Sequence, residues 1–181
     1  MILRLTLLVL MINPYWLSGQ DIKEKIFEYY KLIQQEKYFE AMEYNYLAQG
    51  SEEDKTFIVN LMSGDDETPG YGTMIEEIQV LKAGEVVEGD GRSFASAKVV
   101  LSIKMPLDHL NNEEERLEEV EMMQWSFPDA TYDETSKSCY YKEHLNLICI
   151  KENGKWMFTD ERSYRLGLLE GIVNEEIWSK L

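Results

Sequence analysis

Histidine and cysteine are scarce in this chain of 181 residues, which contains two of each. The cysteines do not form a Cys-x-x-Cys pair and have no pair of histidines near them, so the sequence carries no metal-ligand signature. Gly-x-Ser-x-Gly, the P-loop, Gly-x-Gly-x-x-Gly and His-Glu-x-x-His are also absent. These absences exclude the commonest zinc, nucleotide and serine-hydrolase sites, and we expect neither a metal nor a cofactor.

The sequence also lacks an apolar run of membrane-spanning length. The apolar run from Leu5 to Ile12 follows Arg4, ends before Pro14 and has the length of a signal-peptide core. We therefore predict a signal peptide over residues 1–19, cut between Gly19 and Gln20, and a soluble protein exported to the periplasm or the extracellular space. Glutamine stands where a lipoprotein signal has cysteine, so we expect no membrane anchor. A buried N-terminal helix is the competing interpretation.

Basic residues are few, since 18 lysines and arginines face 34 acidic residues and give a net charge of −16. Arg4 is the only charge in the predicted leader, so its removal would leave −17. Such a charge repels phosphate backbones and anionic membranes, which excludes nucleic acid as a partner. Cationic ligands, metal ions and basic proteins stay open, although acidity can simply keep an exported protein in solution.

The two cysteines, Cys139 and Cys149, lie on one predicted extended segment. Ten strand residues span about 33 Å, whereas a disulfide needs Cα atoms within about 7 Å. We expect two buried thiols, unless a sharp bend near Lys142 to His144 brings them together.

The first part of the mature chain has helical periodicity. Asp21 is the predicted N-cap of a first helix, and further helices are expected over 38–50 and 51–63, with Gly64 as a stop. The apolar face of the first helix recurs at helical spacing: Ile22, Ile26, Tyr29, Tyr30 and Ile33. A loop is expected over 65–72, after which apolar residues recur every second position, as in a strand.

The second part alternates as strands do. A strand is predicted over 74–87 with a bulge near Ala83-Gly84, then a turn over 88–92 and a strand over 95–105. Another strand covers 139–150 with Tyr141, Leu145, Leu147 and Cys149 on one side, and Asn153-Gly154 forms a hairpin turn into a last strand. C-terminal helical pieces follow over 169–181, with Asn174 as a cap.

An acidic insertion separates these strands over residues 106–137. A helix is expected around 110–124, where Arg116 can pair with Glu113 and Glu119. The insertion does not match an EF-hand loop. The apolar cluster that ends this helix, which includes Trp125 and Phe127, should either cap the open end of the fold or dock a partner chain.

The order of helices, long hairpin, connection and second hairpin ends in the string Gly-Lys-Trp-x-Phe over residues 154–158. Over residues 21–160 this order resembles the nuclear-transport-factor-2-like superfamily, also called cystatin-like or SnoaL-like. The resemblance implies an α+β fold in which a curved antiparallel sheet forms a cone around a long helix, leaving a pocket. The insertion and the tail after Asp160 depart from the family pattern. The superfamily contains enzymes, binding modules and assembly domains, so fold alone does not give function.

Enzymes of this superfamily use a carboxylate, a histidine or a tyrosine inside the cone. The matching candidates here are His144, Tyr140 and Asn146, which share one face of a predicted strand. Leu145, Leu147 and Cys149 compete for the inward direction, in which case His144 faces solvent or another subunit. His109, beside Asp108, is expected in an exposed loop and not as a metal ligand.

Aromatic residues supply a second candidate lining for the pocket, suited to a small amphipathic ligand: Tyr29, Tyr30, Trp125, Phe127 and Trp156. The tyrosines at helical spacing can equally be core residues. We therefore expect a single exported α+β domain over residues 20–181 that acts as a non-catalytic binding module for a small apolar ligand or a protein, with a possible homodimer. A small-molecule isomerase or dehydratase and a purely structural dimerisation domain are the alternatives.

Overall fold

The computed structural model describes residues 14–63 and 73–181. The predicted leader core and the predicted loop over 65–72 lie outside the described residues. The predicted cleavage position between Gly19 and Gln20 lies inside the first helix. No helix in the described ranges is long and apolar enough to cross a membrane.

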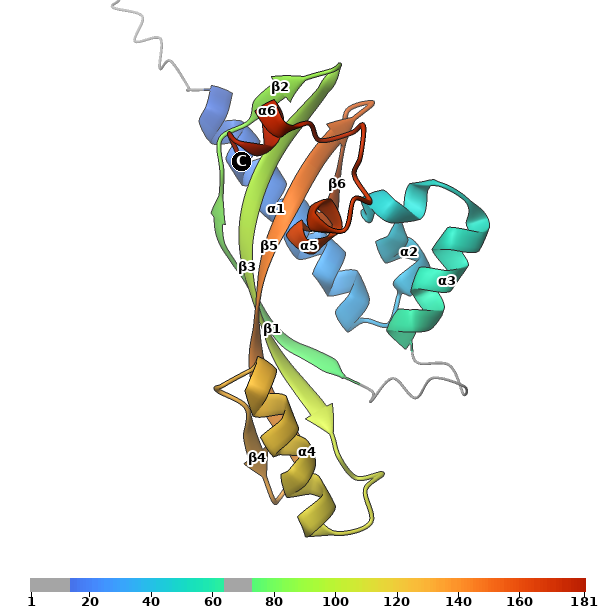
Figure 1. Ribbon diagram of the computed structural model, residues 1–181, viewed down its shortest axis with the longest axis vertical. Coiled ribbons are helices and arrows are strands. Elements are labelled where there is room, and N and C mark those ends of the chain that lie inside the picture. The colour runs from blue at the N-terminus through green and yellow to red at the C-terminus, as the bar shows by residue number, and fades with distance from the viewer. Residues whose placement is uncertain (1–13, 64–72) are drawn as a thin grey trace, which may run out of the picture.

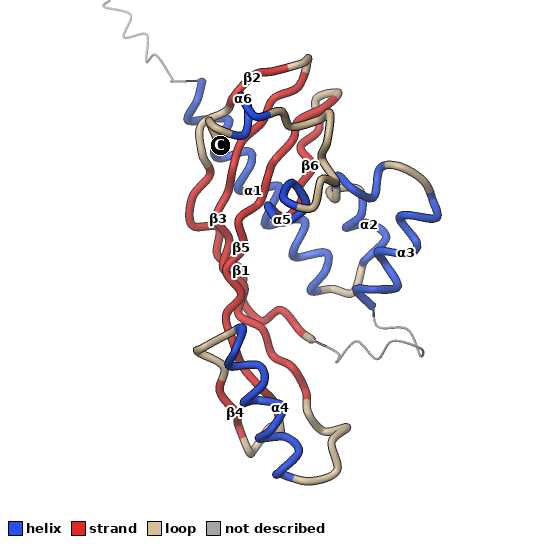
Figure 2. Tube along the Cα trace, in the orientation of Figure 1, coloured by secondary structure: helices blue, strands red, loops and turns tan. Residues whose placement is uncertain are grey.

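The described elements form an α+β fold, as predicted (Figures 1 and 2). The helices are α1 (Pro14–Gln34), α2 (Tyr38–Met42), the 3-10 helix η1 (Tyr46–Gln49), α3 (Glu52–Ser63), α4 (Glu113–Ser126), α5 (Glu161–Arg165) and α6 (Glu175–Trp178). The strands are β1 (Met74–Ala83), β2 (Val87–Gly89), β3 (Arg92–Pro106), β4 (Thr131–Asp133), β5 (Ser138–Glu152) and β6 (Lys155–Asp160).

The strands form one antiparallel sheet in the order β1-β3-β5-β4, with β2 also paired to β3 and β6 to β5. Strands β3 and β5 pair over nearly their whole length, from Ser93 opposite Lys151 to Pro106 opposite Ser138. Figure 1 shows these two strands running the length of the molecule and twisting strongly near its middle. Helices therefore pack on a curled sheet, an arrangement compatible with the nuclear-transport-factor-2-like architecture.

The bulge predicted near Ala83-Gly84 lies slightly earlier in β1, at Leu81. The register shifts lie between Ile75 and Glu77 and between Val80 and Lys82, and β1 ends at Ala83. Gly84 then donates its N–H to the carbonyl of Ser96 at 2.7 Å. A Cβ atom on residue 84 would lie 2.8 Å from Ser96 Oγ, so glycine allows this close backbone approach.

One face of the sheet, the inner face, packs against α1. The helix contributes its predicted apolar stripe, and β5 contributes Leu147 and Cys149, which are buried as predicted. Cys139 and Cys149 lie on one continuous strand and are both buried and free, which confirms the interpretation as two buried thiols.

The predicted start of the first helix at Asp21 is wrong, because α1 begins at Pro14. Proline suits the first turn of a helix, where its missing N–H has no partner to lose. Asp21 instead accepts a hydrogen bond from Trp156 Nε1 at 3.0 Å, which ties α1 to β6. The predicted second helix is divided into α2 and η1 because Asn45 caps η1 by accepting from the Leu47 N–H.

The opposite face, the outer face, is covered over part of its length by the chain after α5. The predicted C-terminal apolar residues pack there against Phe94, Ile148 and Ile150. Asn174 caps α6, as predicted, by accepting from the N–H of Ile177 at 2.9 Å.

The acidic insertion forms a separate lobe at the other end of the sheet, at the bottom of Figure 1. The predicted helix is α4, and the short strand β4 was not predicted. The backbone N–H of Leu107 bonds to the Lys137 carbonyl at 2.8 Å and closes the insertion. A small core joins Val120 of α4 to Met105 and Cys139 of the sheet.

The predicted pairing of Arg116 with glutamates of α4 is wrong. Arg116 is buried, and its guanidinium donates to the carbonyls of Leu107 at 3.0 Å and Leu110 at 2.6 Å. The residue therefore holds the loop before α4 in place, because these two carbonyls face inward towards the side chain.

Candidate functional site

A free stretch of strand edge lies in the middle of β5. Strand β4 pairs only with residues 138–140 of β5, and β6 pairs only with residues 147–152. Residues 141–146 therefore pair with β3 alone among the described strands. A groove of about 730 Å³, the edge groove, lies along this gap between residues 126–129, at the end of α4, and residues of α5.

Two of the three predicted catalytic candidates line the edge groove. His144 and Asn146 are exposed and lie on its floor, next to Lys142 on the same face of β5. Tyr140 is on that face too, but outside the groove, and its hydroxyl lies 3.3 Å from Ser136 Oγ near the β4–β5 turn. The structure thus brings His144 and Asn146 together and leaves Tyr140 apart from them.

An acidic pair with one arginine forms the charged rim of the edge groove. Arg162 Nε and Nη2 bind Asp160 Oδ1 and Oδ2 at 3.0 and 2.8 Å, and Arg162 Nη2 lies 3.5 Å from Glu143 Oε1. Asp160 also caps α5 through the N–H of Arg162. The sequence pattern does not reveal this rim, because Glu143 lies on β5 while its partners come from β6 and α5.

The pKa values of the two carboxylates shift in opposite directions. Burial raises the pKa of Glu143, and Asp160 adds to this, although Arg162 acts against it. Burial alone would also raise the pKa of Asp160, but the hydrogen bonds and the charge of Arg162 lower it. A carboxyl with a raised pKa is a candidate for proton transfer, but the edge groove is open to solvent and does not enclose it.

We expect Glu143→Gln to stabilise the protein at about pH 7 and to leave it unchanged at about pH 3. Because the pKa of Glu143 is higher in the folded chain than in the unfolded one, the free energy of unfolding falls as Glu143 ionises with rising pH. Glutamine cannot ionise and therefore does not lose this stability. Urea unfolding at both pH values measures the free energy of unfolding, with Glu118→Gln on α4 as the control. Lower stability of Glu143→Gln than of the wild type at about pH 7 would contradict the prediction.

The predicted aromatic pocket is divided between two places. Tyr29, Tyr30 and Trp156 are buried in the core between α1 and the sheet, where burial raises the pKa of Tyr29 to about 12. The cavity beside the two tyrosines measures about 210 Å³, which leaves room for only a very small ligand. Phe127 packs on Tyr141 in the lobe, with ring centroids 4.4 Å apart.

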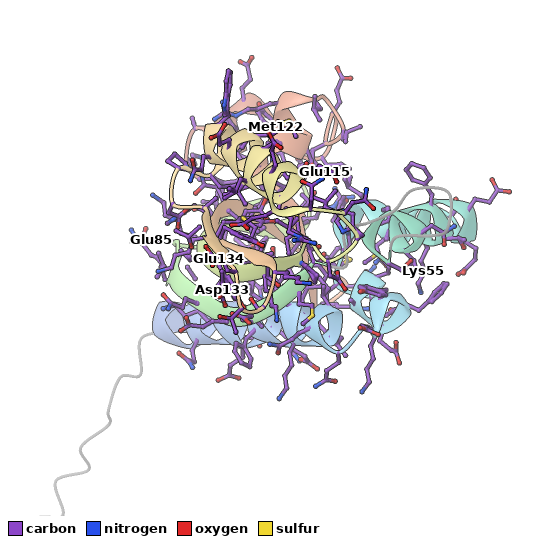
Figure 3. The ribbon with its side chains drawn as sticks, turned by 90° about the horizontal axis from the view of Figure 1, so that it is seen from below. Lys55, Glu85, Glu115, Met122, Asp133 and Glu134 are labelled. Atoms are coloured by element: carbon purple, nitrogen blue, oxygen red, sulfur yellow. The ribbon has the colours of Figure 1, made fainter. Side chains whose placement is uncertain are left out.

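Trp125 does not cap the fold, because 91% of its surface is exposed. Leu117 and Met122 on the same helix are also exposed, at 45% and 62%. We call the exposed part of α4 the α4 surface; its apolar members are Leu117, Met122 and Trp125 and its acidic members are Glu113, Glu114, Glu118 and Glu121. Figure 3 shows Met122 and Glu115 on α4, with Asp133 and Glu134 at the β4–β5 turn.

The charge of the α4 surface is not balanced inside the lobe. Within the described residues, no glutamate of α4 forms an ion pair with a lysine or arginine. The acids in the first turn of α4 interact favourably with the positive end of the helix dipole, but Glu118 and Glu121 lie beyond that turn. The surface therefore combines large apolar side chains with uncompensated negative charge.

No three His, Cys, Asp or Glu side chains are grouped closely enough to hold a metal ion within residues 14–63 and 73–181. No protein-family model, curated protein or solved structure matches this chain.

Proposed function

We propose that this protein is an exported, non-catalytic binding module that engages a protein partner through the α4 surface. The observation that carries the proposal is the almost complete exposure of Trp125 on an acidic helix. Tryptophan is among the residues most enriched in binding hot spots, and removing its exposed apolar surface from water on binding is favourable.

The partner is a basic, amphipathic segment of another protein. Leu117, Met122 and Trp125 would contact its apolar side chains, while Glu118 and Glu121 would face its lysines or arginines. Charge argues against a second copy as the occupant, because two α4 surfaces in contact would bring like charges together. A small apolar ligand is supported less well, since the cavity beside Tyr29 and Tyr30 is small.

Export and family membership belong to the same proposal. The run from Leu5 to Ile12 and the small residues before Gln20 support a leader of residues 1–19, and α1 on the curled sheet supports a nuclear-transport-factor-2-like chain. The intact mass of the protein from its own cells tests export, because a cut before Gln20 leaves residues 20–181.

The binding test uses a fluorescein-labelled amphipathic peptide of lysine and leucine as its probe, followed by fluorescence anisotropy. We expect Trp125→Ala to weaken binding about tenfold or more. Its free energy of unfolding should change by less than about 0.5 kcal/mol, since the side chain is exposed. Leu166→Ala is the matched control, because Leu166 is 74% exposed but lies after α5.

Glu118→Gln with Glu121→Gln should make peptide binding less dependent on salt, as expected when ion pairs at the rim of an interface are removed. The proposal fails if the peptide does not bind, or if Leu166→Ala weakens binding as much as Trp125→Ala.

Catalysis is the second candidate function, and Glu143 is the observation that favours it. Its raised pKa and its place beside His144, Asp160 and Arg162 suit proton transfer to a polar substrate in the edge groove. The open groove makes this the weaker candidate, because enzymes usually exclude water from such a group.

A further inference from the structure

A second groove lies at the end of the molecule opposite α4. It measures about 780 Å³ and lies where the first turns of α1, the end of β1, the middle of β3 and the C-terminal residues meet. Figure 1 shows the labelled C-terminal end of the chain close to α6 and the upper part of β3, far from α4. We call it the lysine groove, after the four lysines that line it: Lys23, Lys82, Lys98 and Lys180.

The lysine groove reverses the charge of the rest of the chain. Acidic residues outnumber basic ones by almost two to one overall. Here 4 of the 13 lysines meet around one opening, and among the described residues of its lining Glu85, on the β1–β2 connection, is the only Asp or Glu. A site of opposite sign on a strongly acidic protein concentrates anions locally, because its low-dielectric walls focus the positive potential.

A bulge in β1 brings two of these lysines, Lys82 and Lys98, directly opposite each other. The register passes from Val80 opposite Val99 to Lys82 opposite Lys98, so Leu81 is an extra residue. If Leu81 paired with Lys98 in a regular register, Lys82 would stand opposite Ala97, on the inner face. The bulge therefore moves Lys82 to the outer face and places two ammonium-bearing side chains in directly opposite positions.

This arrangement is unfavourable in the free protein. Like charges directly opposite each other in a sheet destabilise it. Within the described residues, neither Lys82 nor Lys98 has a carboxylate within ion-pair distance, whereas Lys180 Nζ binds Glu176 at 2.7 Å. Lys23 Nζ points to the same place and lies 3.4 Å from the carbonyl of Leu81, the bulged residue. An anion between Lys82 and Lys98 would relieve their repulsion.

We propose that the lysine groove binds a small polyanion that carries phosphate or carboxylate groups. Ammonium groups on flexible stems act as point charges and select for charge, while the planar pairing of arginine is not used here. Two or more charged groups on the ligand would match Lys82 and Lys98 together, with Lys23 at the side of α1. Removal of the proposed leader would add the α-ammonium group of Gln20, which also lines the groove.

The test is calorimetric titration of the purified protein with inorganic pyrophosphate. We expect binding, and we expect Lys82→Gln with Lys98→Gln to weaken it about tenfold or more. The matched control is Lys31→Gln with Lys37→Gln, which changes the net charge equally but lies outside the groove. Its effect should stay below about twofold at physiological salt, because distant exposed charges are screened.

Melting temperatures show whether a variant has lost the binding site or has lost its fold. Without ligand, the double variant at Lys82 and Lys98 should melt at the same temperature as the wild type or higher, since it removes the repulsion. Pyrophosphate should raise the melting temperature of the wild type and not that of the variant. Absence of binding by the wild type, or equal weakening in both double variants, overturns the proposal.

A second arm separates a free anion from a lipid headgroup. Vesicles of phosphatidylcholine and phosphatidylglycerol are sedimented with each variant. We expect no co-sedimentation, because the net charge of the chain is −16 and an anionic surface repels it. Vesicle binding that depends on Lys82 and Lys98, without pyrophosphate binding, would assign the groove to lipid and overturn the assignment to a free anion.

Discussion

Phe158→Ala is expected to lower the free energy of unfolding by about 3–5 kcal/mol, the range for large-to-small changes of buried aromatic residues. Phe158 is 1% exposed and packs against Tyr29 and Tyr44, with ring centroids 6.1 and 6.4 Å away. Its N–H also donates to the Tyr44 carbonyl at 2.7 Å. The residue thus joins three parts of the molecule: β6, α1 and the segment before η1.

Such a loss is a large fraction of the total stability of a typical domain, about 5–15 kcal/mol. Phe57→Ala is the control, because Phe57 is 64% exposed on α3 and loses the same atoms. We expect it to change the free energy of unfolding by less than about 0.5 kcal/mol. Urea unfolding followed by circular dichroism measures both, and equal losses would show that Phe158 does not occupy the core.

The strand that carries Phe158 was predictable because its signals are local. Asn153 and Gly154 have positive φ angles of 51° and 82°, as the favoured two-residue hairpin turn requires. Period-two alternation then places Trp156 and Phe158 on the inner face. The C-terminal apolar residues were predicted for a similar reason, since Asn174 is a short-range cap signal.

The other features depend on distant partners, and sequence periodicity does not report these. Strand β4 has only three residues and pairs across the insertion. The charged rim of the edge groove combines Glu143 with Asp160 and Arg162, which lie on different elements. An aromatic residue such as Trp125 is usually buried, and the sequence does not predict its exposure because this depends on how α4 packs on the lobe.

The two proposed binding sites carry opposite charges and lie at opposite ends of the sheet. The α4 surface carries uncompensated glutamates, whereas the lysine groove carries four lysines at the other end. Separated charge of this kind orients a molecule as it approaches a charged partner. A basic protein would meet the α4 surface while the lysine groove stays open to a small anion, so the two ligands need not compete.

Arg116→Met is expected to lower the free energy of unfolding by about 2–4 kcal/mol, although methionine keeps the apolar part of the side chain. The change leaves the carbonyls of Leu107 and Leu110 without their charged donor. Unsatisfied buried carbonyls are costly, so the loop before α4 should loosen first. Hydrogen exchange should accelerate in α4 and β4 more than in α1.

This loosening connects stability with the proposed function. If the lobe must be rigid to present Trp125, peptide binding should weaken in Arg116→Met even though Arg116 is buried beneath the α4 surface. Arg165→Met is the control, since the Arg165 side chain is 70% exposed and its ion pair with Glu161 lies at the surface. Surface pairs contribute at most about 1 kcal/mol. Unfolding losses of equal size in the two variants would mean that the carbonyls of Leu107 and Leu110 find water as a substitute donor, and that α4 is held by its apolar contacts alone.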